Sequence, residues 1–204
     1  MESRQITIPV SRLEMFSDAV IAIIITLMIL SIEIPSIEAS DSSGVVWEKL
    51  SGMLQPAASY LLSFIIVGVL WVNHHQFLRQ VKQADRNLLW FNLHLLFWLS
   101  WVPIPTNLLG HSIHRPEFMV LYGFVMFMCL LAFLLMRLYV ERANLFIENI
   151  SPRLKKQSRT KLIVCTGLYL VAIFAGYISV YVSIFIFVAI AIAYFFPSKI
   201  EIQQ

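Results

Sequence analysis

The chain has 204 residues, of which 59% are hydrophobic and only 13% are charged, whereas charged residues make up about 25% of an ordinary soluble domain. Too few polar residues are present to cover a water-soluble fold, which excludes most soluble enzymes, disordered chains and disulfide-framed secreted modules, and favours a multi-pass membrane protein. The net charge of +3 can be interpreted only together with the positions of the basic residues along the chain.

The first predicted membrane span covers residues 12–34 and carries an acidic residue close to its apolar run. Asp18 directly precedes the stretch AVIAIIITLMIL. An acidic side chain in this position is costly in lipid and usually faces water or a protein partner. Asp18 is therefore a candidate functional residue.

Three further spans are predicted at residues 56–77, 88–109 and 118–138, each long enough to cross about 30 Å of hydrocarbon. The second begins at Pro56, a favourable first residue of a helix, and the third is expected to close at Pro103 and Pro105. The last apolar stretch, residues 162–196, would be about 50 Å long as one helix. That is too long for one crossing, so we predict two short helices with a tight turn within residues 177–183.

The placement of basic residues predicts the orientation of these six spans. If the N-terminus lies inside, 13 of the 15 Lys and Arg residues lie in cytoplasmic segments, and only Lys49 and Arg115 lie outside. The positive-inside rule therefore favours cytoplasmic N- and C-termini. We expect a multi-pass protein of the cell's inner (plasma) membrane, and the basic balance reflects topology rather than nucleic-acid binding.

Two short motifs carry a resemblance to a known family. The pattern R-x-x-x-F-S-D, formed by Arg12, Phe16, Ser17 and Asp18, opens the first span, and Trp71 with His74 forms W-x-x-H late in the second. The first pattern resembles the signature of the lysosomal and endosomal potassium-channel family, in its bacterial branch. The six-span layout is similar to one repeat of that family over essentially the whole chain, although the strong motif covers only seven residues.

The resemblance implies an all-α integral membrane protein in which residues 1–204 form a single six-helix channel domain. It implies a homotetramer that conducts potassium through a central pore lined by the first helices, without a TVGYG filter loop. It places the narrowest point at Ile23 and continues the lining at Leu27 and Leu30. The expected partners are other copies of the chain, membrane lipid and the permeant potassium ion, with no cofactor, metal, catalytic site or nucleic acid.

Helical geometry independently groups the residues of the first span around Ile23. At 100° per residue, four residues fall within about 40° of Ile23: Phe16, Ala19, Leu27 and Leu30. Thr26 flanks this stripe at about 60°, and Arg12 lies on it near the helix end, where its long side chain can snorkel or turn aside. Asp18 lies about 140° away, so we expect it to organise contacts between helices rather than touch the ion.

Polar residues of three spans are expected at a similar depth. Asn73, His74 and His75 lie near the inner end of the second span, and Asn92 and His94 lie near the inner end of the third. An unpaired carboxylate there is costly. We therefore predict a buried polar layer joining Ser17 and Asp18 to these residues, with His74 as the first choice of donor to Asp18 and Asn73 as the second. For each histidine, solvation at the membrane interface is the alternative.

An apolar stripe can control ion flow without ligand oxygens. A narrow neck of Ile and Leu tends to empty of water, and an ion crosses a wetted neck only if it is partly dehydrated. Potassium sheds water more easily than sodium, so we expect Ile23 to set the barrier, with Leu27 and Leu30 supporting it and Thr26 assisting hydration nearby. The same spacing is also typical of helices that pack against other helices or lipid.

Three other functions agree with some of these sequence features. A secondary cation transporter would use Asp18 as its coupling group, although helices broken near the midplane, which would support this function, are not predicted for the first span. A membrane enzyme would use Asp18, His74 and His75, but no nucleophile–base motif accompanies them. A noncatalytic assembly subunit would conduct nothing after purification.

Overall fold

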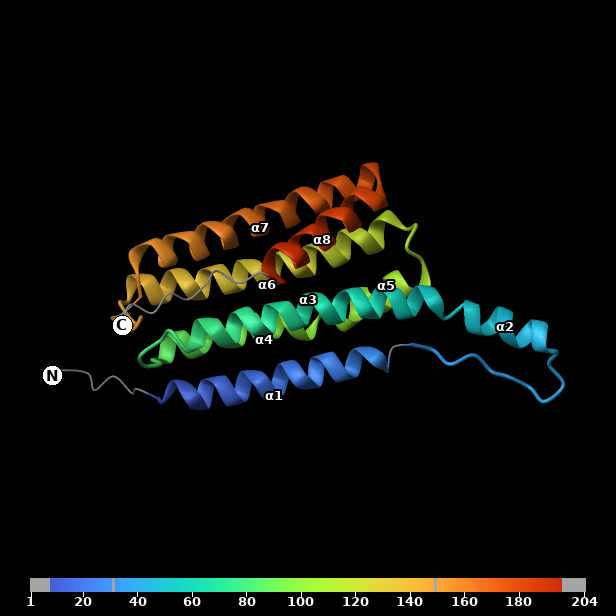
Figure 1. Ribbon diagram of the computed structural model, residues 1–204, viewed down its shortest axis with the longest axis horizontal. Helices are drawn as coiled ribbons and strands as arrows, with labels where there is room; N and C mark the ends of the chain where they lie inside the picture. Colours follow the sequence, from blue (N-terminus) through green and yellow to red (C-terminus); the bar gives the residue numbers. More distant parts are fainter. Residues whose placement is uncertain (1–7, 31, 149, 196–204) are drawn as a thin grey trace.

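The computed structural model describes residues 8–30, 32–148 and 150–195, and their regular structure is helical apart from two isolated β-bridges. The helices are α1 (Val10–Ile29), α2 (Ser43–Ser51), α3 (Leu54–Leu78), α4 (Arg86–Ser100), α5 (Pro103–His111), α6 (Pro116–Arg142), α7 (Pro152–Ile178) and α8 (Val180–Phe195). They form an elongated bundle with α1 along one edge, α3, α4 and α5 in the middle, and α6, α7 and α8 along the other edge (Figure 1). The prediction of an all-α membrane fold is confirmed for this part of the chain.

Four helical stretches have both the length and the hydropathy of membrane spans: Ser43–Leu78, Arg86–His111, Pro116–Arg142 and Pro152–Ile178. The helix α8 is apolar but shorter, and α1 has 20 residues with three charged side chains in its first half. The first predicted span was too long, because α1 ends at Ile29 rather than at residue 34. Ile34 precedes Pro35, and a residue before proline is disfavoured in a helix.

Local sequence signals explain where several helices begin. Asp85 caps α4 by accepting a hydrogen bond from the Leu88 amide at 2.8 Å, which satisfies one of the unpaired donors at a helix start. Ser151 caps α7, with Pro152 as the first helical residue. Pro116 begins α6 in the same way, because the fixed φ of proline suits the first turn.

Of the two helix ends predicted within apolar stretches, the structure confirms the turn between the last two spans but not the end of the third span. The turn between the last two spans is confirmed: α7 ends at Ile178, Ser179 is extended, and α8 begins at Val180; residue 196, the last of the predicted sixth span, lies outside the described residues. The prediction that the third span closes at Pro103 and Pro105 is wrong. The helix α4 ends at Ser100, and both prolines lie in the first turn of the next helix, α5. Their missing amide donors cost no helical hydrogen bond there, and α5 continues to His111.

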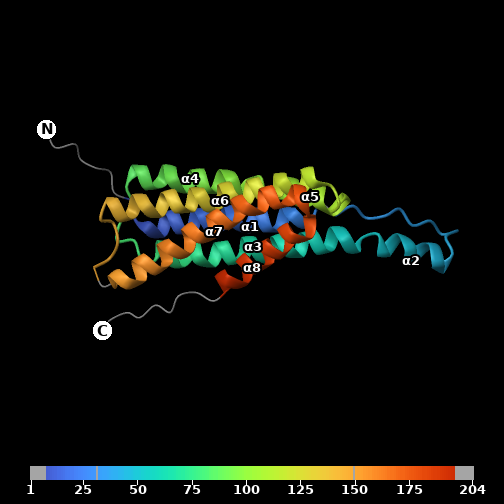
Figure 2. The same ribbon diagram turned by 90° about the horizontal axis from the view of Figure 1, so that it is seen from above.

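The helix α2 is an element that hydropathy did not predict. It leads into α3 and projects beyond the rest of the bundle in both views (Figures 1 and 2). The preceding loop is tied to it by the Lys49 ammonium, which donates to the Ser36 carbonyl at 2.8 Å and to the Asp41 carboxylate at 2.7 Å. The bond from Lys49, helped by the Glu38 amide, lowers the pKa of the Asp41 carboxyl.

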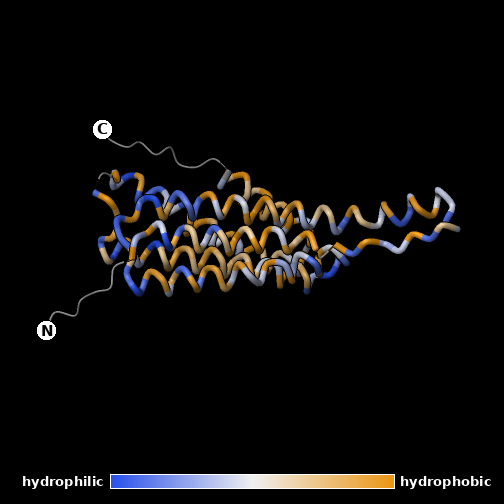
Figure 3. Tube along the Cα trace, turned by 90° about the horizontal axis from the view of Figure 1, so that it is seen from below, coloured by the Kyte–Doolittle hydropathy of each residue, from blue (hydrophilic) through white to orange (hydrophobic). Residues whose placement is uncertain are grey.

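Hydrophilic segments gather at the end of the bundle where α1 begins (Figure 3). The α3–α4 and α6–α7 connections lie at the same end, and most of the basic residues of the described chain lie in them or in the ends of the helices that flank them. The middle of the bundle is largely hydrophobic in the same view. This polarity is that of a bundle whose ends meet water and whose middle meets hydrocarbon.

Close packing of α6 against α7 and α8 depends on Gly123. A Cβ atom at this position would lie 3.0 Å from Ile173 Cγ1 and 3.4 Å from Phe187 Cζ, whereas a Cβ at Gly167 on α7 would meet nothing within 4 Å. We expect Gly123→Leu to destabilise the protein by about 1–3 kcal/mol through overpacking, and Gly167→Leu to change little. Thermal unfolding of the purified variants measures both; equal melting temperatures would contradict the packing role of Gly123.

Candidate functional site

The helix α1 divides into a covered face and an uncovered face. Leu13, Ser17, Ile21, Ile24 and Met28 are buried where α1 packs against α3, α4 and α5. The remaining face is apolar for most of its length, and the other helices that the structure describes leave it open. Lipid, water or another copy of the chain can cover it.

The predicted stripe lies on this uncovered face. The exposed fractions are 57% for Ile23, 50% for Leu27 and 76% for Leu30, and Phe16 and Ala19 are exposed on the same side. Thr26 is also exposed, and its hydroxyl lies within hydrogen-bonding distance of the Ala22 and Ile23 carbonyls, at 2.9 and 3.0 Å. The structure thus groups the six residues that angular spacing placed together.

A buried polar network lies on the covered face and joins three helices. Asn92 of α4 and Ser17 of α1 are fully buried, and His74 of α3 is 1% exposed. The Asn92 carbonyl oxygen accepts from His74 Nε2 at 2.9 Å, and its amide nitrogen donates to Ser17 Oγ at 2.9 Å. The Ser17 hydroxyl donates to the Leu13 carbonyl at 2.8 Å. Asn92 therefore connects α1 to α3 through two buried hydrogen bonds.

Asp18 uses a different partner from the one predicted. Its Oδ1 accepts a hydrogen bond from the Trp71 indole at 2.7 Å, so His74 as first choice of partner was wrong. Asn73, the second choice, donates to the Val69 carbonyl of its own helix at 2.7 Å. The physical reason is that Ser17 and Asp18 are 100° apart around α1, so they face different neighbours.

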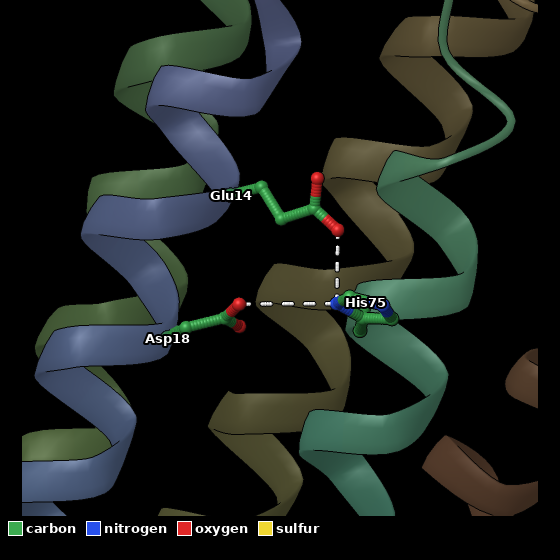
Figure 4. Close-up of side chains that lie close together, drawn as sticks. All are labelled: Glu14, Asp18 and His75. Carbon is green, nitrogen blue, oxygen red and sulfur yellow. Dashed lines mark ion pairs between the residues drawn. The ribbon is translucent and has the colours of Figure 1, made fainter.

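Glu14, which the sequence analysis did not select, and His75, which it placed in the predicted polar layer, lie beside Asp18. His75 Nδ1 lies 2.9 Å from Glu14 Oε1 and 3.8 Å from Asp18 Oδ2, and all three side chains point toward one another across the gap between α1 and α3 (Figure 4). The spacing of Glu14 and Asp18 was the available signal, because residues i and i+4 share a helix face. Arg12 is exposed in the first turn of α1, and among the described residues it takes no part in these side-chain contacts.

The Asp18–Trp71 bond predicts a defect in assembly rather than in selectivity. Asp18→Ala removes the acceptor of the Trp71 indole, a hydrogen bond that contributes about 0.5–1.5 kcal/mol, and Trp71→Phe removes the donor of the same bond. We expect both variants to give less assembled protein in size-exclusion chromatography, with potassium-over-sodium selectivity retained in what assembles. Asn73→Ala is the control, because the Asn73 amide donates to the Val69 carbonyl of its own helix. Well-assembled Asp18→Ala protein with strongly altered selectivity would contradict this role.

Comparison with known proteins gives consistent matches over nearly the whole chain. The family model described as the endosomal/lysosomal potassium channel TMEM175 matches residues 12–103. A potassium channel of Chryseobacterium sp. is 34% identical over 190 residues, covering 92% of this chain and 93% of the relative. A potassium channel of Chamaesiphon minutus is 33% identical over 186 residues, covering 89% and 91%.

A solved structure supports the same relationship at the level of the fold. The crystal structure of a lysosomal potassium-selective channel TMEM175 homolog from Chamaesiphon minutus aligns with a TM-score of 0.76 and 29% sequence identity. The alignment covers 91% of this chain and 95% of that chain. The similarity therefore extends over the whole bundle and is not limited to the short motif at the start of α1.

Proposed function

The chain belongs to the family of the endosomal/lysosomal potassium channel TMEM175, and from this premise we propose that it is a potassium-selective ion channel whose pore is lined by α1. Relatives from Chryseobacterium and Chamaesiphon that match about nine tenths of the chain are named potassium channels. The observation in this chain that carries the proposal is the exposed apolar stripe centred on Ile23. Ion conduction, rather than an enzymatic reaction, is the activity it supports.

The packing of a single bundle argues for a pore shared between copies. Large side chains fill its interior, with Ile21, Val67, Leu95, Leu99 and Tyr122 almost completely buried. Such a core offers an ion no wetted route through one bundle. A conduit along the uncovered face of α1 needs several copies arranged around an axis, and we assign the homotetramer that the family resemblance implies.

In this arrangement four copies of Ile23 form the narrowest point. Leu27 and Leu30 continue the apolar lining, and Ala19 and Phe16 extend it in the other direction. A ring without ligand oxygens gates by dewetting, and in its wetted state it favours the ion that gives up water more readily. Thr26 flanks the neck with a hydroxyl oxygen that faces away from the chain's own core, which supports a role in hydrating the ion beside the constriction.

The proposed orientation follows from charge. Thirteen of the 15 Lys and Arg residues belong to segments at the end where α1 begins or to the terminal segments. The positive-inside rule places this end and both termini in the cytoplasm. Residues 1–204 then act as one six-helix channel domain in the inner (plasma) membrane, with lipid around the outside of the tetramer.

Reconstitution into liposomes with paired potassium and sodium flux assays tests the function. We expect fast potassium flux that exceeds sodium flux, and discrete single-channel currents in planar bilayers. Slow, saturable flux without unitary currents would favour a secondary cation transporter with Asp18 as the coupling group. Well-folded tetramers that pass neither ion would show that the chain is not a channel.

A further inference from the structure

We propose that Glu14, Asp18 and His75 form a binding site for a divalent transition metal ion of the Zn²⁺ class, and that an ion bound there inhibits conduction by joining α1 to α3. The inhibitory part of the inference rests on the proposed channel function. The binding part rests only on the geometry of the three side chains.

The donor atoms are already close to the spacing that such an ion requires. Ligands about 2.0–2.1 Å from a tetrahedral Zn²⁺ lie about 3.3 Å apart. The distances from His75 Nδ1 are 2.9 Å to Glu14 Oε1 and 3.8 Å to Asp18 Oδ2, and all three donor atoms lie within 4.8 Å of one another. The side chains are only partly buried, which leaves room for side-chain rotations that bring the three donor atoms toward this spacing.

The hydrogen bonding of the His75 imidazole also suits a metal ligand. His75 Nδ1 is shielded from solvent and makes no hydrogen bond, because its contact with Glu14 has the distance but not the angle of one. Figure 4 shows this atom facing both carboxylates. A shielded nitrogen that faces two carboxylate oxygens is available as a third ligand to a metal ion held by those oxygens.

Charge and orientation also suit a cation. The ion pairs that the described residues form with Glu14 and Asp18 are both with His75, so neither carboxylate is neutralised by a Lys or Arg. The other oxygen of Asp18 is held by the Trp71 indole, which is the kind of outer contact that orients a ligating carboxylate. One imidazole with two carboxylates favours Zn²⁺ or Ni²⁺ over Mg²⁺ and Ca²⁺, which prefer oxygen ligands alone.

The site lies away from the proposed ion path. Glu14 and Asp18 are about 180° and 140° around α1 from Ile23. An ion bound there would not occupy the pore but would tie the pore-lining helix to the scaffold helix α3. Inhibition from this site is therefore expected to be independent of membrane voltage, unlike block by an ion that enters the pore.

Calorimetric titration of the purified, chelator-treated channel with Zn²⁺ tests the site without relying on conduction. We expect one ion per subunit, with affinity reduced more than tenfold in Glu14→Gln and in His75→Gln. His111→Gln, at the opposite end of the bundle, is the control and should bind as the wild type does. Unchanged Zn²⁺ affinity in both site variants would overturn the proposal.

A variant with a changed metal preference distinguishes the loss of a ligand from misfolding. His75→Cys replaces the imidazole with a soft thiolate, so we expect Cd²⁺ affinity to rise relative to the wild type; no rise in a well-folded variant would count against His75 as a ligand. In liposomes, Zn²⁺ on the cytoplasmic side should reduce wild-type potassium flux but not that of His75→Gln. Equal inhibition of the wild type and His75→Gln by Zn²⁺ would overturn the regulatory role. If the wild type passes no potassium in the absence of metal, the channel function is contradicted, but the calorimetric result on the metal site still holds.

Discussion

Replacing Ile23 with alanine is expected to raise the potassium leak about tenfold and to weaken discrimination against sodium. The shorter side chain widens and wets the neck, and a tenfold increase corresponds to a barrier lowered by about 1.4 kcal/mol. Ile23→Asn should act in the same direction, because its amide keeps water in the constriction. Reversal potentials under bi-ionic conditions, together with basal liposome flux, measure both effects.

Ile24 provides a matched control on the other side of the same helix. It is 4% exposed, so Ile24→Ala removes the same atoms from the covered face of α1. We expect a loss of stability of about 2–5 kcal/mol, with selectivity unchanged in the protein that folds. If Ile23→Ala and Ile23→Asn both keep wild-type selectivity, Ile23 is not part of the filter.

Replacing Asn92 with leucine is expected to cost about 2 kcal/mol or more of folding stability. The substitution leaves His74 Nε2 without its acceptor and Ser17 Oγ without its donor in a buried environment, and an unsatisfied buried polar group costs about 1–3 kcal/mol. It also removes the buried polar connection that runs from Ser17 of α1 through Asn92 to His74 of α3. Thermal or denaturant unfolding in detergent measures the loss.

Asn87 lies on the same helix and serves as the control. It is exposed and donates to the Tyr139 hydroxyl at 3.2 Å, so Asn87→Leu should change stability by less than about 1 kcal/mol. Combining Asn92→Leu with His74→Leu should recover part of the lost stability, because removal of both partners leaves fewer unpaired groups. If Asn92→Leu unfolds at the same temperature as Asn87→Leu, the network contributes no stability.

Much of the fold could be predicted from single segments of sequence. The lengths and hydropathies of the apolar runs located the helices, since crossing hydrocarbon demands a minimum length of apolar chain. The stretch of residues 162–196 had to be divided for the same reason, and the break lies at Ser179. The short helix α2 was not predicted, because its nine residues are too few to cross the hydrocarbon and therefore give no such signal.

Within α1, the sequence by itself determined which residues share a face. Angular spacing separated the Ile23 stripe from Ser17 and Asp18, and the structure shows the same division. This was possible because the angle between side chains on one helix depends only on their positions in the chain.

Only the tertiary structure decided which residues of α3 meet α1. Trp71 and His75 contact Asp18, while His74, one residue from His75, faces Asn92 in the interior. Adjacent helical residues point about 100° apart, so the rotation of α3 about its own axis selects the partners. That rotation is set by side-chain packing among α1, α3 and α4, which the spacing of residues within one helix does not contain.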